Sequence, residues 1–315
     1  MKRSLTTLMA VALGISLVAG ACGKDDNKKA STTTTAGKSV SQVAITIGAQ
    51  DFQESKILAE IYAQGLKAQG YNTSVKTLGA NAYRPVEIEA FKSNTINFAP
   101  EYAASMLEFV NNKKGEATGD AKATTDKLNT YLPTVGSGLV ALEPSDAVDT
   151  NAFVITKKTS DDKGIKSLSD LATKGKDLKL GAPADCATNP NCVAGLKKIY
   201  NVDYSKYTTL GSGQPIAQAL EAGSIGIGVL FSTDSTIAVK NFVLLTDDKH
   251  MLAADNIVPV ISKALDGEKG LADAVNKISA KLTTDELIKL NKQYDVDKAD
   301  PAKIAEGFLQ QEDLL

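Results

Sequence analysis

The chain has 315 residues, of which 43% are hydrophobic and 23% are charged, a composition typical of globular proteins with one large or two medium domains. The formal net charge is −2, and no long run of Lys and Arg occurs. Both features argue against a nucleic-acid-binding protein, because such proteins usually carry a basic patch.

The N-terminal segment is typical of exported bacterial proteins. Lys2 and Arg3 precede an apolar stretch over residues 8–19, which is too short to span a membrane, and small residues then lead to Cys22. This pattern resembles a bacterial lipoprotein signal, in which residues 1–21 are removed and Cys22 carries the lipid. Ordinary secretion with cleavage near the same place is the alternative. Residues 22–41 are polar and rich in Thr and Ser, so we expect a disordered tether.

The next part of the chain alternates between strand and helix patterns. Hydrophobic periodicity predicts strands at residues 43–47, 73–78 and 95–98, and helices at residues 54–69 and 83–92. This order implies a mostly parallel, doubly wound sheet.

The third strand runs into a Pro-Glu-Tyr sequence. Pro100 should stop the strand, because proline donates no ladder hydrogen bond. Tyr102 should then lie at the carboxyl end of the strand and at the start of a helix of small residues. In open α/β sheets, ligands bind at that edge.

A second set of elements follows. It comprises strands at residues 152–156, 178–181, 225–230, 242–245 and 257–261, helices at residues 167–171, 193–200 and 214–222, and tail helices at residues 270–282, 284–294 and 301–309. Two α/β lobes fit this length better than one sheet. We expect residues 42–148 and 256–315 to form lobe 1, with the helical tail packed on it, and residues 149–255 to form lobe 2.

The sequence gives no support for an enzyme. His250 is the only histidine, which removes Ser-His-Asp and Cys-His arrangements, and no phosphate-binding or zinc-protease motif occurs. We therefore predict no catalytic residue, no metal site and no cofactor. Cys186 and Cys192 have a spacing that makes a poor metal site without a nearby His. In an exported chain we expect them to form a disulfide.

Six blocks occur in an order and spacing that together are informative. They are residues 45–54, Leu78-Gly79 with Arg84, residues 100–102, residues 181–183, residues 231–234 and residues 255–260. Together they resemble the substrate-binding lipoproteins of osmoprotectant ABC importers, the family that binds glycine betaine, choline and carnitine. The resemblance runs from about residue 43 to the C-terminus. It implies a periplasmic-binding-protein-like α/β fold of two lobes, each a doubly wound, mostly parallel sheet, with the ligand in the cleft between them.

The resemblance also implies which residues contact the ligand. The family encloses the quaternary ammonium in aromatic rings, and Tyr102 matches the tyrosine of its Pro-Glu-Tyr block. Asn151 stands near a position where some members carry another tyrosine. The residues expected to contact the ligand are Gln50, Phe52, Tyr83, Tyr102, Ser105, Asn151, Phe231 and Thr233. Arg84 is expected to pair with Glu87 or Glu101 rather than with the ligand.

The resemblance predicts an extracytoplasmic, monomeric receptor, held by lipid on Cys22 at the outer face of the bacterial cell membrane. It would capture a small quaternary amine such as glycine betaine, choline or carnitine and deliver it to the transmembrane subunits of an ABC permease. Nucleic acid is not an expected partner. The alternatives are the same receptor with another amine, such as ergothioneine, or an anchored lipoprotein with no transport role, for example an extracellular enzyme or an adhesin.

Overall fold

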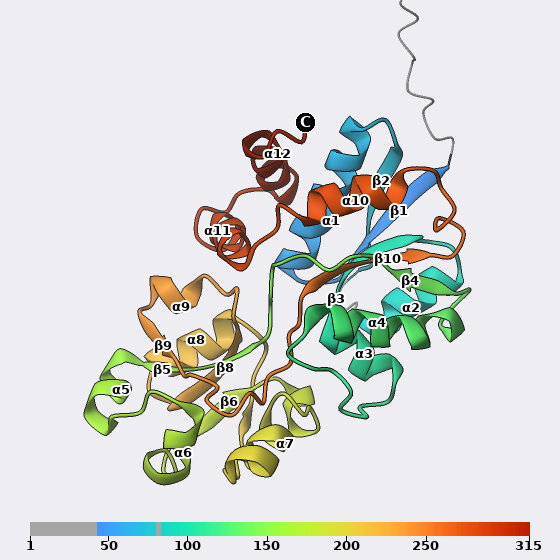
Figure 1. Ribbon diagram of the computed structural model, residues 1–315. Coiled ribbons are helices and arrows are strands. Elements are labelled where there is room, and N and C mark those ends of the chain that lie inside the picture. Colours follow the sequence, from blue (N-terminus) through green and yellow to red (C-terminus); the bar gives the residue numbers. More distant parts are fainter. Residues whose placement is uncertain (1–42, 80–82) are drawn as a thin grey trace, which may run out of the picture. The chain divides into compact units, whose positions relative to one another are not determined.

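The computed structural model describes residues 43–79 and 83–315. The predicted signal segment, the lipidation site at Cys22 and the tether lie outside the described residues. Within the described residues, two five-stranded sheets have the orders β2-β1-β3-β10-β4 and β7-β6-β8-β5-β9 (Figure 1). In this part of the chain no helix is both long and apolar enough to cross a membrane.

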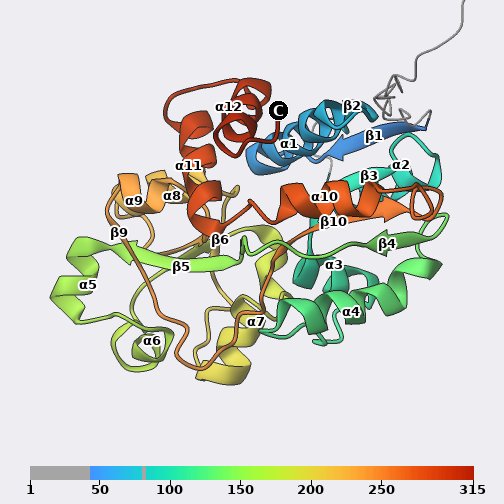
Figure 2. The ribbon, with the colours of Figure 1, turned by 45° about the horizontal axis from the view of Figure 1, so that its top comes forward.

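The first sheet is covered by helices on both faces. Its strands are β1 (Ala44–Ala49), β2 (Asn72–Thr77), β3 (Phe98–Tyr102), β4 (Leu139–Ala141) and β10 (Ile257–Ser262). Its helices are α1 (Gln53–Ala68), α2 (Arg84–Lys92), α3 (Ala103–Val110), α4 (Ala121–Tyr131), α10 (Leu271–Ser279), α11 (Thr284–Asp295) and α12 (Pro301–Gln311). Figure 2 shows α1 and α10 on one side of this sheet and α3 and α4 on the other.

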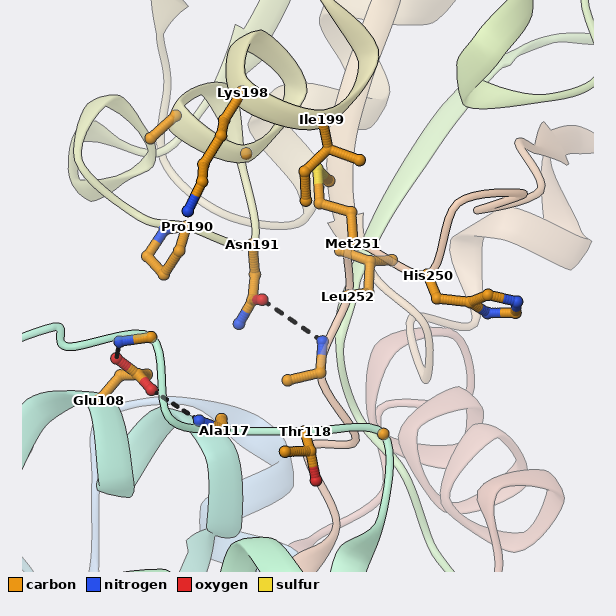
Figure 3. Close-up of a pocket in the computed structure, with 15 residues that line it drawn as sticks. Glu108, Ala117, Thr118, Pro190, Asn191, Lys198, Ile199, His250, Met251 and Leu252 are labelled. Carbon is orange, nitrogen blue, oxygen red and sulfur yellow. Dashed lines mark hydrogen bonds between the residues drawn. The ribbon is translucent and has the colours of Figure 1, made fainter.

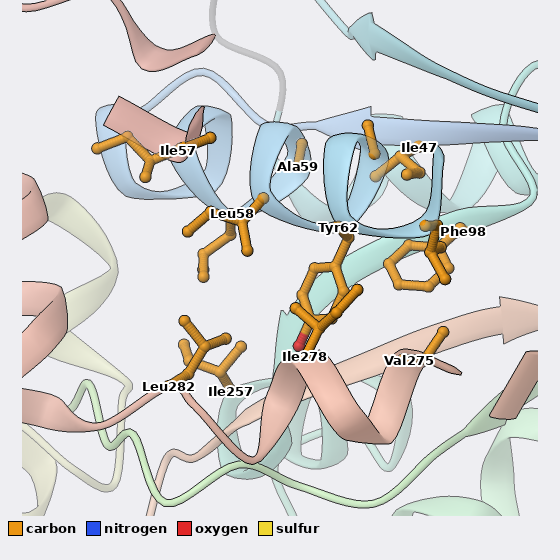
Figure 4. Packing of buried hydrophobic residues seen from close by; sticks show 14 of the residues in the cluster. Ile47, Ile57, Leu58, Ala59, Tyr62, Phe98, Ile257, Val275, Ile278 and Leu282 are labelled. Carbon is orange, nitrogen blue, oxygen red and sulfur yellow. The ribbon is translucent and has the colours of Figure 1, made fainter. Parts of the chain in front are cut away.

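Strand β10 shows how the sequence pattern produces this layering. Ile257 and Ile261 belong to the core under α1 and α10, whereas Val258 and Val260 belong to the core under α2, α3 and α4. Successive side chains of a strand point to opposite faces, so a continuous apolar strand is buried on both sides. In Figure 4, Tyr62 of α1 lies among Phe98, Ile278 and other apolar side chains of the first core.

The second sheet has the same kind of cover. Its strands are β5 (Asn151–Thr156), β6 (Leu180–Ala182), β7 (Thr208–Thr209), β8 (Ile227–Phe231) and β9 (Phe242–Leu244). Its helices are α5 (Lys157–Lys163), α6 (Leu168–Lys174), α7 (Val193–Gly195), α8 (Gln214–Glu221) and α9 (Thr236–Val239), with a π-helical turn over Leu196–Tyr200. Side chains of α6 and α7 pack in the core of one face, and those of α8 pack in the core of the other.

Each sheet contains one strand that runs against the other four. These strands are β10, which is antiparallel to β3 and β4, and β5, which is antiparallel to β8 and β9. Both follow a crossing from the other sheet, since the chain passes from β4 to β5 and returns from β9 to β10. The two crossing segments pair with each other through an antiparallel bridge between Val148 and Asn256. The fold class is thus the predicted α/β arrangement of two doubly wound, mostly parallel sheets.

The expectation that Pro100 stops the third strand is wrong. β3 continues through Pro100 to Tyr102, and Pro100 lies directly opposite Pro259 of β10. An antiparallel ladder alternates between pairs that exchange hydrogen bonds and pairs that do not. Two prolines can therefore face each other at a pair of the second kind, where neither backbone nitrogen has to donate.

Several helix boundaries follow from local features of the sequence. The Ser167 hydroxyl and the Asp170 carboxylate form a reciprocal capping box at the start of α6. The Thr283 hydroxyl accepts a hydrogen bond from the Glu286 N–H at the start of α11. Gly213 turns the chain into α8 with φ of 73°, a conformation that favours glycine. In the tail, α10, α11 and α12 all contact α1.

Other elements were missed. The sequence pattern predicts no element over residues 111–150, where the structure has α4 and β4, and none at α5, α9 or β7. Helix α4 buries few apolar side chains, with Leu128 the largest, and β4 has three residues. Such short or weakly amphipathic elements carry little periodic signal.

Candidate ligand-binding site

Two strands of the first sheet bring predicted residues to the same edge. β1 and β3 run parallel, so their carboxyl ends meet there. β1 ends at Ala49, just before Gln50, and β3 ends at Tyr102. Helix α3 begins at the next residue, with Tyr102 as its N-cap. The predicted position of Tyr102, at a strand end and a helix start, is confirmed.

The second sheet gathers three predicted residues in the same way. β8 ends at Phe231, and Asn151 of the antiparallel strand β5 lies directly opposite it. Thr233 follows two residues later and is buried. Its backbone N–H donates to Oδ1 of Asp149 at 3.3 Å.

A chain of hydrogen bonds connects these two groups. The Tyr102 hydroxyl donates to Oε1 of Glu54 at 2.7 Å. The amide nitrogen of Asn291, on α11, donates to Oε2 of Glu54 at 2.6 Å and to the Thr233 carbonyl at 3.1 Å. Glu54 and Asn291 are both buried. Burial raises the pKa of Glu54, and its hydrogen bonds offset only part of that shift.

Gln50 lies in a second buried cluster, centred on Glu101. Nε and Nη2 of Arg84 donate to the two Glu101 oxygens at 2.7 and 2.6 Å. The Gln50 amide nitrogen donates to Glu101 at 3.1 Å and to Glu87 at 3.0 Å. The expected pairing of Arg84 within this group is therefore confirmed, with Glu101 as its partner.

The two carboxyls of this cluster titrate differently. Burial opposes ionisation of Glu101, but the Arg84 guanidinium outweighs burial and holds the pKa of Glu101 below its usual value. Glu87 is buried beside the Glu101 charge, and both effects raise its pKa well above the usual value. Glu101 is thus the ionised member of the pair, and Glu87 is the member that retains a proton more readily.

Ser105 contacts a carboxylate on a crossing segment. Its backbone N–H donates to Oδ1 of Asp255 at 2.9 Å, and its hydroxyl donates to Oδ2. The Asp149 N–H, on the other crossing segment, donates to the Asp255 carbonyl at 3.0 Å. Burial raises the pKa of Asp255 to about 6 and that of Asp149 well above its usual value.

The predicted aromatic residues differ in their surroundings. The rings of Phe52 and Tyr102 have centroids 6.0 Å apart, and Tyr102 is only 6% exposed. Phe231 is 39% exposed. Tyr83 is 53% exposed as the N-cap of α2 and makes no described hydrogen bond or ring contact with the other predicted residues. The structure thus places Phe52, and not Tyr83, beside Tyr102.

The predicted disulfide between Cys186 and Cys192 is present, and its loop lies beside a cavity of about 240 Å³. The Asn151 amide nitrogen donates to the Asn191 carbonyl in this loop at 3.1 Å. Asn191, Lys198 and Met251 line the cavity from one side, and Glu108 and Thr118 line it from the other (Figure 3). None of the eight predicted ligand-contact residues lines this cavity.

Sequence reasoning missed most of the buried polar residues around the site. Glu54 and Asp255 lie inside two of the blocks that carry the family resemblance, so their place in those blocks could have identified them. Asp149 and Asn291 have no comparable signal, because neither belongs to a block or a motif. Within the described residues, no group of three or more His, Cys, Asp or Glu could hold a metal ion.

Known proteins share this sequence and architecture. A glycine-betaine-binding protein of Pseudomonas aeruginosa PAO1 is 25% identical over 284 residues, which cover 86% of this chain and 88% of that protein. The carnitine transport binding protein OpuCC of Listeria monocytogenes is 25% identical over 164 residues, which cover 51% of this chain and 53% of that protein.

Solved structures show the same fold. The crystal structure of a glycine betaine/carnitine/choline ABC transporter protein matches with a TM-score of 0.71 at 22% identity, covering 87% of this chain and 99% of that one. Lactococcal OpuAC, closed around glycine betaine, matches with a TM-score of 0.57 at 13% identity, covering 86% and 96%. The OpuAC family, described as the substrate binding domain of the ABC-type glycine betaine transport system, matches residues 43–311, and this chain belongs to that family.

Proposed function

We propose that this chain is the extracytoplasmic substrate-binding protein of an ABC importer and captures a small quaternary ammonium compound, such as glycine betaine, choline or carnitine. One observation carries the proposal: Tyr102 and Phe231 end strands of two different sheets, and hydrogen bonds through Glu54 and Asn291 connect those two strand ends. Aromatic faces suit such a ligand because its charge is spread over methyl groups. The related proteins are binding proteins of transport systems, and we propose binding rather than catalysis here.

Capture requires movement, because Tyr102 is buried. We propose that residues 42–148 and 256–315 move as one lobe and residues 149–255 as the other, with the paired crossing segments as the hinge. Opening would expose the Tyr102 ring, and closure would bury the ligand between the lobes. The closed form would then be the one that the permease recognises.

We also propose that lipid on Cys22 holds the receptor, as a monomer, at the outer face of the cell membrane. The apolar segment and small residues before Cys22 support this location. The test is metabolic labelling of the full chain with a palmitate analogue, compared with Cys22→Ala. Equal labelling of both chains would contradict the anchor.

The binding test is calorimetric titration of residues 42–315 with choline, glycine betaine, carnitine, ergothioneine and proline. Phe231→Ala should weaken binding of the preferred amine by about 30-fold, because a desolvated ring contributes roughly 2 kcal/mol. Leu244→Ala is the matched control, since Leu244 is also an exposed apolar residue near the end of a strand of that sheet. It should leave the affinity unchanged.

Tyr102 provides the second variant pair. Tyr102→Ala should abolish detectable binding, whereas Tyr102→Phe keeps the ring, loses the bond to Glu54, and should still bind. Circular dichroism of each variant shows whether it has folded. If no quaternary amine binds the parent, the proposed function is wrong. If Phe231→Ala and a folded Tyr102→Ala both bind as the parent does, the assigned site is wrong.

A further inference from the structure

We propose that the site selects a quaternary ammonium cation without a carboxylate, of the choline type, over a zwitterion such as glycine betaine. This inference rests on the proposed function and concerns the ligand class of the same site. It follows from which hydrogen-bond donors the protein leaves for the ligand.

A ligand carboxylate needs N–H, hydroxyl or cationic donors, and three of the predicted residues already use their donors on the protein's own carboxylates. The Gln50 amide donates to Glu87 and Glu101. The Tyr102 hydroxyl donates to Glu54, and the Ser105 hydroxyl donates to Asp255. To use one of these three donors, a zwitterion would have to displace a buried carboxylate from it.

The cation of the Glu101 cluster, the Arg84 guanidinium, is also occupied. Its Nε and Nη2 donate to Glu101, at 2.7 and 2.6 Å. Buried carboxyl groups outnumber this guanidinium: Glu54, Glu87, Glu101, Asp149 and Asp255. Another carboxylate would therefore enter a region already crowded with carboxyl groups, next to the ionised Glu101, whereas a cation would be stabilised there by the carboxyl groups that ionise.

Two unpartnered atoms point the same way, independently of the charge balance. Oδ1 of Asn291 is buried without a hydrogen-bond partner among the described residues, and so is Oε1 of Glu87. The Asn291 amide nitrogen donates to two acceptors, Glu54 and the Thr233 carbonyl, which fixes its oxygen on the other side. The Asn291 amide oxygen only accepts hydrogen bonds, so it suits a ligand hydroxyl or cation and not a carboxylate, and the Glu87 carboxyl can accept from a ligand hydroxyl as well.

Lys198 is the competing donor. It is exposed, lines the cavity beside the disulfide loop, and points toward that cavity in Figure 3. A zwitterion that bound with its carboxylate on Lys198 would use the cavity and not the network around Tyr102. The experiment must therefore separate these two arrangements.

The test compares calorimetric titrations of choline and glycine betaine into residues 42–315 near neutral pH. We expect choline to bind at least about tenfold more tightly, a difference of about 1.4 kcal/mol. Glycine betaine binding equally or more tightly would overturn the proposal while leaving the receptor function intact. If neither these ligands nor any other quaternary amine binds, the proposed function fails as well.

Variants assign the selectivity to residues. Asp255→Asn removes one negative charge and keeps an oxygen for Ser105, so the ratio of choline to betaine affinity should fall by about tenfold. A purely structural role for Asp255 would weaken both ligands alike and leave the ratio unchanged, which would contradict the proposal. Asp266→Asn is the control, because Asp266 pairs with Lys263 at the surface. The cavity arrangement predicts a different result. The parent would bind betaine more tightly than choline, and Lys198→Ala would lose betaine binding while choline binding stayed unaffected. That result would overturn the proposal.

Discussion

Replacing Arg84 by methionine tests whether the buried cluster depends on one guanidinium. The Glu101 carboxylate is fully buried and accepts two Arg84 bonds of 2.6 and 2.7 Å. Removing one partner of a buried ion pair typically destabilises a protein by about 3–5 kcal/mol. Because the Arg84 side chain is 19% exposed, we expect the lower end, about 3 kcal/mol.

Urea unfolding near pH 8 measures this loss. The chain has no tryptophan, so circular dichroism and tyrosine fluorescence are the probes. With an m-value of about 3 kcal/mol per molar urea, the midpoint should fall by about 1 M. The loss of unfolding free energy caused by Arg84→Met should become smaller toward pH 5. Without Arg84, Glu101 has a raised pKa and takes up a proton as the pH falls.

Two further variants serve as comparisons for the stability loss of Arg84→Met. Lys122→Met removes an exposed ion pair with Asp126, whose side chains are 70% and 63% exposed, and should change stability by less than about 1 kcal/mol. The double variant Arg84→Met/Glu101→Gln removes both charges and should recover part of the loss. If Arg84→Met is as mild as Lys122→Met and shows no dependence on pH, Glu101 is not an uncompensated buried charge and the reasoning is wrong.

Two further predictions concern stability. Asp255 has a folded pKa of about 6, against an ordinary value of 3.8, so its stabilising contribution is present at low pH and is lost as pH rises through about 6. Asp255 should account for about 1 kcal/mol of the fall in unfolding free energy between about pH 5 and pH 7.5. In Asp255→Asn, the urea midpoint should therefore depend less on pH over that interval. An unchanged pH dependence would contradict the assignment. Gly195→Ala should destabilise by about 1–3 kcal/mol, because a Cβ there would lie 1.9 Å from a backbone carbonyl oxygen of the disulfide loop. Gly307→Ala in α12 meets nothing within 4 Å and should be neutral or stabilising; equal unfolding free energies for the two alanine variants would refute this packing.

The sequence predicted the fold class well, because strands that are buried on both faces are continuous apolar runs, which are easily recognised between helices of 3.6-residue periodicity. It failed at Pro100, where an intrinsic preference was overridden by the register opposite Pro259. That register depends on a strand far along the chain, and no local pattern reports it. The weakly amphipathic helix α4 was missed for a related reason, since its few apolar side chains are assigned to the core by tertiary packing alone.

The site was predictable only in outline. The strand ends that carry Tyr102 and Phe231 followed from the order of the elements. The partners of these residues did not, because Glu54 and Asn291 are 237 positions apart in the sequence and meet only in the folded chain. Such long-range pairing of buried polar groups is set by the fold, so the family resemblance named the aromatic residues but not Glu54 and Asn291 between them.

The most direct test of the account is to locate the ligand's methyl groups. Choline labelled with ¹³C in its N-methyl groups, bound to residues 42–315, allows isotope-filtered nuclear Overhauser measurements to aromatic protons. The account predicts contacts from these methyl groups to the rings of Tyr102 and Phe231. Contacts to His250 and Met251, which line the cavity beside the disulfide loop, without any to Tyr102, would contradict it.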